Sequence, residues 1–198
     1  MNFLLIAEIS EVLNAPDFGP NFKAHLDQKH HSRVRQASMT AWSLLAAALH
    51  RAGIRELPTA AFTASGKPYF ENSPLHFSIS HSGNLAAALL SDSPCAVDLE
   101  QCRSEIQDRL YKRCLSPEEQ TSNCDFFECW TKKECIGKLD GTGISAHPAQ
   151  TSSLDSRYAE CFHTRKLTDV QGSTYVLTTL CTDKAKPHIQ KIEPEVNC

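Results

Sequence analysis

A short apolar run that ends in two carboxylates places the strongest constraint on this chain. In residues 94–101, PCAVDLEQ, Asp98 and Glu100 project to one face of a strand while Val97 and Leu99 face the other way. Two carboxylates held that close repel each other unless a cation or a proton lies between them. Oxygen ligands of this kind suit Mg²⁺. Taken alone, the stretch fits an exposed edge strand with two solvated acids equally well.

Length and charge limit the class of protein. The 198 residues suffice for one domain or two small packed halves. A formal net charge of -3 argues against nucleic acid and anionic membranes as partners. No apolar run approaches the roughly 20 residues that span a bilayer, and residues 1–8, MNFLLIAE, predict a first strand rather than a signal peptide. We therefore expect no nucleic-acid or membrane partner. We also expect a monomeric, cytoplasmic protein.

The chain contains nine cysteines, a high and odd number. No pair has the C-x-x-C spacing, and Cys124, Cys129 and Cys135 match no zinc pattern. Without a secretory signal, we expect reduced and mostly structural thiols rather than a disulfide framework.

The first half predicts one long helix and several short strands. Apolar residues at helical spacing predict a helix over 32–52, ending at Gly53. Lys29 and Arg33 lie in a basic cluster at its start, which is a phosphate-binding candidate, although such clusters are usually solvated. Strands are expected at 59–63, 75–82, 85–90 and 95–100, and the last three are expected to form a meander.

The second half predicts helices and then strands. A helix is expected at 104–113, and residues 116–119, SPEE, have the pattern of a helix start with a capping box. A strong helix over 126–139 ends at Gly141 or Gly143. Strands follow at 158–166, 173–181 and 188–192, so the fold class is α+β.

Charged residues lie on the apolar face of the 126–139 helix. At 100° per residue, one stripe contains Phe127, Trp130, Glu134 and Lys138. A surface Glu–Lys pair at this spacing contributes only about 0.3–0.5 kcal/mol. Because both charges continue an aromatic stripe, we expect them to face a buried seam. A third carboxylate, a metal ion and a phosphate would be suitable partners there.

Four motifs, taken in order across about residues 26–145, resemble those of the surfactin-type 4′-phosphopantetheinyl transferases. They are Gly66-Lys67-Pro68, FSISHS at 77–82, VDLE at 97–100 and WTKKECIGK at 130–138. The resemblance implies a pseudo-dimer of two similar α+β halves, each a helix packed on a small antiparallel sheet. We divide these halves at residues 1–100, with coenzyme A phosphate contacts and the first metal acids, and 101–198, with the catalytic helix and carrier docking.

The resemblance also implies roles for individual residues. Asp98, Glu100 and Glu134 match the Mg²⁺ ligands. The coenzyme A contacts are Gly66, Lys67 and Pro68 at the adenine and ribose end, Ser80 and His81 at the phosphates, Lys138 at the pyrophosphate, and Lys133 beside the metal-binding Glu134. Glu119 matches an acidic position of the middle motif. Trp42 stands where such proteins often have an arginine, and Lys29, Arg33 or Arg35 could replace that phosphate contact.

The expected activity is transfer of the 4′-phosphopantetheine arm of coenzyme A to a serine of an apo acyl or peptidyl carrier protein. Glu134 and Lys138 would be its catalytic residues. By resemblance, residues 141–165 form part of the carrier surface, and Arg109, Lys112 and Arg113 are further basic candidates. Two alternatives remain: a metal-dependent hydrolase of nucleotide pyrophosphates, and a coenzyme A-binding module without transfer.

Overall fold

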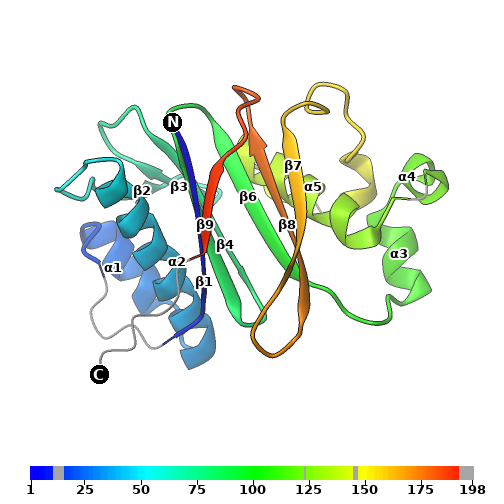
Figure 1. Cartoon of the computed structure of the whole chain (residues 1–198), viewed down its shortest axis with the longest axis horizontal. Coiled ribbons are helices and arrows are strands. Elements are labelled where there is room, and N and C mark those ends of the chain that lie inside the picture. The colour runs from blue at the N-terminus through cyan, green and yellow to red at the C-terminus, as the bar shows by residue number, and fades with distance from the viewer. Residues whose placement is uncertain (11–15, 123, 145–146, 192–198) are drawn as a thin grey trace.

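Two sheets, each covered by its own helix, form the body of the protein (Figure 1). The computed structural model describes residues 1–10, 16–122, 124–144 and 147–191. The first sheet has four strands in the order β4-β5-β1-β9. They are β1 (Asn2–Glu8), β4 (His76–Ser82), β5 (Leu85–Ser91) and β9 (His188–Lys191). All neighbours are antiparallel except β1 and β9, which run parallel.

The second sheet contains three antiparallel strands in the order β6-β8-β7. They are β6 (Cys95–Gln101), β7 (Phe162–Thr168) and β8 (Thr174–Cys181). A small hairpin pairs β2 (Ala60–Phe62) with β3 (Pro68–Phe70). The mixed α+β class expected from the sequence is confirmed.

Two long helices cover the sheets, and shorter helices lie at the ends of the molecule (Figure 1). The helices are α1 (Pro20–Asp27), α2 (Ser32–Arg51), α3 (Asp108–Cys114), α4 (Pro117–Thr121), α5 (Phe126–Asp140) and a 3₁₀ turn, η1 (Pro148–Gln150). The predicted capping box starts α4: Ser116 accepts a hydrogen bond from the Glu119 amide, and the Glu119 carboxylate accepts one from the Ser116 amide. Helix α5 ends at Gly141, whose φ of 72° is the left-handed conformation that glycine adopts most easily.

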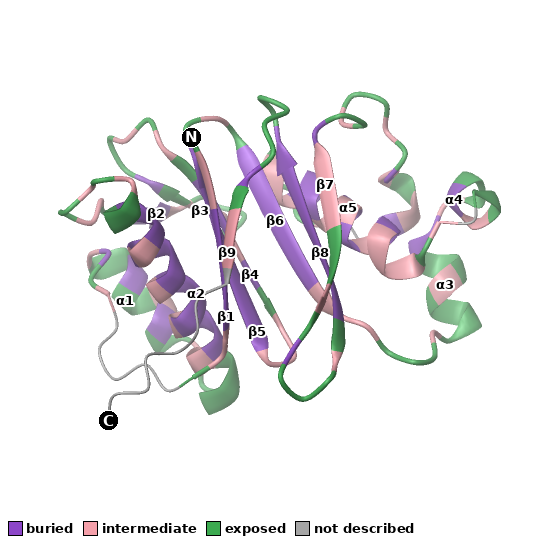
Figure 2. Cartoon of the chain, viewed as in Figure 1, coloured by how far each residue is buried: buried purple, intermediate pink, exposed green. Residues whose placement is uncertain are grey.

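Apolar side chains form three clusters that hold these layers together. The first lies between α2 and one face of the four-stranded sheet and includes the fully buried Trp42. The second lies between the two sheets and includes Val97 and Leu99. The third lies between α5 and the far side of β6 and β8. Figure 2 shows β6 and β8 as the buried centre of the molecule.

The predicted meander was wrong in its last strand. Strand β5 pairs with β4 on one side and with β1 on the other, so no edge of β5 is left for β6. Strand β6 pairs with β8 instead. As a result the acids lie where the two sheets adjoin, with β4 beside β6.

Three short elements and one disulfide were not predicted. No helix or strand was expected where α1, β3 and the 3₁₀ turn η1 lie. Cys124 and Cys129 form a disulfide, contrary to the expectation of reduced thiols. The physical reason is local: Cys129 lies in the first turn of α5 and Cys124 just before its N-cap, which brings their Cα atoms within 6.5 Å.

Within the described ranges no helix is both long and apolar enough to cross a bilayer. The other cysteines of these ranges are free: Cys95, Cys102, Cys114, Cys135, Cys161 and Cys181.

Candidate active site

A cavity of about 350 Å³ lies where β4, β6 and α5 come together, opposite α1. Most of the predicted site residues line it: Lys29, Gly66, Pro68, Ser80, His81, Asp98, Glu100, Glu134 and Lys138. These residues are far apart in the sequence. The structure therefore gathers the motifs into one place.

Strand β6 brings two acids to the cavity because its alternate side chains face opposite ways. Val97 and Leu99 are buried in the cluster between the sheets. Asp98 and Glu100 face the cavity, as the alternation predicted, and Asp98 is only 4% exposed.

Serine hydroxyls of β4 connect it to β6 in place of a backbone ladder. Ser80 Oγ donates to Asp98 Oδ1 over 3.0 Å and accepts from the Leu99 amide over 3.2 Å. Ser82 Oγ donates to Glu100 Oε2 and accepts from the Gln101 amide, each over 3.0 Å. Each serine thus binds one acid and the backbone amide that follows it. The Ser80 hydroxyl, expected at a phosphate, is engaged with β6.

Lys138 points from α5 into this cluster of acids. Its Nζ lies 2.7 Å from Asp98 Oδ1 and also donates to the Val97 carbonyl over 2.9 Å. Burial would lower the pKa of Lys138, but the charge and hydrogen bond of Asp98 raise it above its ordinary value. Lys138 therefore faces the seam, as the helical stripe predicted, with Asp98 as its ion-pair partner.

Burial and the charges of neighbouring carboxylates raise the pKa values of the other two acids, Glu134 and Glu100. Burial, and then the charges of Asp98 and Glu100, raise the pKa of Glu134 to about 7, against the opposing charge of Lys138. Burial and then Asp98 also raise the pKa of Glu100, against hydrogen bonds from Ser82 and Trp130. Asp98 and Glu100 therefore lie close enough to Glu134 to disfavour its ionised form, and Asp98 likewise disfavours the ionised form of Glu100.

The donor set fits a hard cation. Asp98 Oδ2 is buried and has no hydrogen-bond partner, and such an atom is costly to leave alone. Oxygen-only donors with surplus negative charge are the chemistry that Mg²⁺ takes. In the described part of the chain, however, no three His, Cys, Asp or Glu side chains are grouped closely enough to hold a metal ion. Binding would therefore require the acids to draw together.

Basic groups line the same cavity. Burial, and then the charges of Lys29 and Lys138, lower the pKa of His81, and burial lowers the pKa of Lys29. His25, which the sequence analysis did not single out, also lines the cavity and stacks on Phe62 with ring centroids 4.5 Å apart. Pro20 at the first position of α1 is the sequence feature that could have indicated the helix on which His25 lies. These groups could bind an anion.

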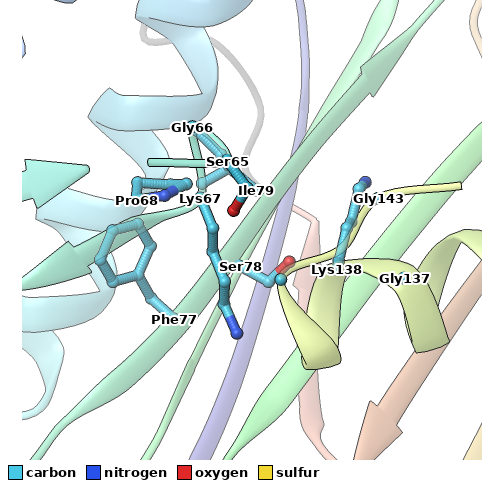
Figure 3. Close-up of a pocket in the computed structure, with 11 residues that line it drawn as sticks. Ser65, Gly66, Lys67, Pro68, Phe77, Ser78, Ile79, Gly137, Lys138 and Gly143 are labelled. Carbon is cyan, nitrogen blue, oxygen red and sulfur yellow. The ribbon is translucent and has the colours of Figure 1, made fainter. Parts of the chain in front are cut away.

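Lys67 lies at a second, adjoining cavity of about 250 Å³. Figure 3 shows this cavity between the turn that carries Gly66, Lys67 and Pro68 and the end of α5. Lys67 Nζ donates to the Leu139 carbonyl over 2.7 Å, so it connects that turn to α5. Gly137 of α5 packs here against the backbone of Gly143. A Cβ at position 137 would lie 2.7 Å from the Gly143 carbonyl carbon, so this close approach requires glycine.

Two predicted contacts lie elsewhere. Lys133 was expected to bind coenzyme A, but its side chain is fully buried on another side of α5. There it pairs with Glu119 and donates to the Cys114 carbonyl over 2.6 Å. Arg33 is exposed and donates to Asn84 Oδ1 over 3.0 Å, and it does not line either cavity.

Glu119 is the acidic member of this buried ion pair. Burial would raise the pKa of Glu119, but hydrogen bonds from Lys133 and from the Ser153 and Ser116 amides hold it below its ordinary value. The Ser153 amide lies 2.6 Å from Oε1. The motif residue Glu119 therefore joins α4, α5 and the segment after η1.

An α+β fold with acids and bases around one cavity at the junction of two sheets defines a class of site suited to a cation and a phosphate-bearing ligand. Parts of the chain are similar to curated 4′-phosphopantetheinyl transferases, so the resemblance expected from the motifs is confirmed. No family model matches the chain.

Three relatives illustrate the similarity. The 4′-phosphopantetheinyl transferase psf-1 of Bacillus pumilus is 33% identical over 90 residues, which cover 41% of this chain and 39% of the relative. AcpT of Salmonella typhimurium is 34% identical over 122 residues, covering 54% of this chain and 60% of the relative. A putative transferase of Haemophilus influenzae is 32% identical over 94 residues, covering 41% and 40%. The similarity thus spans about two fifths to three fifths of each relative.

Proposed function

We propose that this protein transfers the 4′-phosphopantetheine arm of coenzyme A to a serine of an apo acyl or peptidyl carrier protein and releases adenosine 3′,5′-bisphosphate. One observation carries the proposal: a single cavity joins Asp98, Glu100, Glu134 and Lys138 to the basic residues Lys29 and His81. Similarity to curated 4′-phosphopantetheinyl transferases supports it.

Binding would use both cavities. The turn with Gly66 and Pro68 lines the two of them, so a ligand that extends from one to the other would lie along it. Lys29 and His81 would contact phosphate, where burial strengthens charge attraction. Lys67 would hold the turn against α5 through its bond to the Leu139 carbonyl.

The chemistry would be attack of the serine Oγ on the β-phosphorus of coenzyme A, with cleavage of the bond from that phosphorus to the bridging oxygen. Such reactions depend mainly on positioning and charge stabilisation. Glu134 would accept the serine proton on a carboxylate oxygen. Lys138 Nζ would stabilise charge on the departing phosphate. Mg²⁺, held by Asp98, Glu100 and Glu134, would supply neutralisation of pyrophosphate charge.

A transfer assay with a panel of apo carriers tests this proposal. The purified chain is incubated with coenzyme A, Mg²⁺ and each carrier, and the carrier mass is measured. A mass gain of one phosphopantetheine arm that chelator abolishes supports transfer. Hydrolysis of coenzyme A without any carrier would indicate the pyrophosphate hydrolase, and binding without either product would indicate a binding module.

Other predictions belong to the same proposal. We propose that the halves 1–100 and 101–198 are related as a pseudo-dimer, with a helix on a small sheet in each. The expectation that both sheets are antiparallel was wrong for the four-stranded sheet, because β9 runs parallel to β1. Strands are shared across that boundary, because β6 pairs with β8 and β9 pairs with β1. A monomeric state, a cytoplasmic location and carrier docking on residues 141–165 also stay predictions. Within that segment, residues 145 and 146 lie outside the described ranges.

A further inference from the structure

Both carboxylate oxygens of Glu100 accept a hydrogen bond, and the two donors come from different elements. Ser82 Oγ in β4 donates to Oε2 over 3.0 Å. Trp130 Nε1 in α5 donates to Oε1 over 3.3 Å. A carboxylate held at both oxygens has a fixed orientation, while each oxygen keeps a further lone pair for another partner.

The two donors are themselves fixed by their surroundings. The Ser82 hydroxyl accepts the Gln101 amide over 3.0 Å, so its own proton is directed to Glu100. The Trp130 ring stacks on Phe126, with an interplanar angle of 3° and centroids 6.4 Å apart. Groups that are held in place before a ligand arrives lose little freedom when it binds.

Without these hydrogen bonds, the Glu100 side chain could adopt a second orientation. Besides the cavity that it shares with Asp98 and Glu134, it lines a separate cavity of about 200 Å³ with Ile106, Leu110 and Phe126. Arg103 lines that second cavity as well. A released Glu100 carboxylate could turn toward the arginine and away from the other two acids.

We infer that Ser82 and Trp130 are positioning residues that hold Glu100 on the side of Asp98 and Glu134, from which the three acids can draw together around a divalent cation. The inference rests on the proposed function, in which Glu100 is a metal ligand. Neither residue would touch the substrate or the metal. Partners of this kind that orient metal ligands typically change metal affinity about 10–100-fold when they are removed.

Cation binding by the full chain tests the inference directly. Mn²⁺ replaces Mg²⁺ as the probe, because free Mn²⁺ is measured by electron paramagnetic resonance without any substrate. Ser82→Ala and Trp130→Phe should each weaken Mn²⁺ binding about tenfold. Trp130→Phe keeps a stacking ring and removes only the N–H donor. Ser82→Thr keeps the hydroxyl and should restore wild-type affinity.

Ser91→Ala is the matched control. Ser91 is a fully buried β5 hydroxyl that also accepts an amide hydrogen bond, from Ser93, and donates to Asn2, away from the cavity. It should leave Mn²⁺ affinity unchanged, and the melting temperature of every variant is measured in chelator to confirm folding.

Unchanged Mn²⁺ affinity in folded Trp130→Phe and Ser82→Ala would overturn the inference, as would an equal loss in Ser91→Ala. Absence of Mn²⁺ binding by the wild type would also overturn it. Transfer to apo carriers is measured separately. A chain that shows the expected binding series but modifies no carrier would refute the proposed function and leave the positioning role supported.

Discussion

Lys133 Nζ lies 2.5 Å from Glu119 Oε2, and both side chains are fully buried. The pair connects the middle of α5 to the capped start of α4. Because Glu134 directly follows Lys133, this interaction helps to set the rotation of the helix that presents Glu134 and Lys138 to the cavity.

The first prediction concerns this pair. Glu119→Gln leaves the Lys133 ammonium buried without its counter-charge and should lower the free energy of unfolding by about 3–5 kcal/mol. Glu118→Gln, an exposed neighbour in the same helix, should change it by less than about 0.5 kcal/mol. Urea denaturation measures both. Equal stabilities of the two variants would contradict a structural role for the pair.

The second prediction concerns pH. The pKa of Glu134 is about 7 in the folded protein against an ordinary value of 4.5. The folded state therefore holds the proton more tightly, and the Glu134 contribution to stability falls as pH rises from about 4.5 to 7. In chelator, Glu134→Gln should remove this decline, so that the variant gains stability over the wild type at pH 8 and not at pH 4. Parallel stability profiles of the two proteins between those pH values would argue against the raised pKa.

The third prediction separates two basic residues. His81→Ala should weaken binding of coenzyme A more than that of dephospho-coenzyme A, by about tenfold or more, if its ring binds the 3′-phosphate. Lys67→Ala should weaken both ligands equally, because the Lys67 ammonium is bound to the Leu139 carbonyl. Calorimetric titration of both ligands gives the comparison. Equal losses in His81→Ala would show that His81 does not distinguish them.

Local periodicity predicted much of the site. The alternation in β6 correctly separated Val97 and Leu99 from the two acids, and the stripe on α5 correctly turned Lys138 to the seam. Each of these inferences needed only the geometry of one element. The capping box at Ser116 was equally local.

Long-range pairing was beyond such reasoning. Nothing within residues 75–101 shows that β1 occupies the second edge of β5 and so excludes β6. Lys133 was misplaced for a related reason, because its partner Glu119 lies in another helix and the motif shows only adjacency to Glu134. Contacts between side chains that are far apart in the sequence can be identified only once the fold is known.

The last prediction tests the orientation of α5. The double change Glu134→Lys with Lys138→Glu places a carboxylate where Lys138 now meets Asp98, 2.7 Å away, and an ammonium among the proposed metal ligands. At an effective dielectric near 20, each misplaced charge about 4 Å from its neighbour costs roughly 4 kcal/mol, or about a thousandfold in rate. The swap should therefore be inactive in carrier modification, with no rescue over either single variant. The matched swap Glu128→Lys with Lys132→Glu, at the same spacing in α5 and outside the cavity lining, should retain activity. Activity restored by the first swap would show that the charges at positions 134 and 138 are interchangeable and would overturn the proposed site.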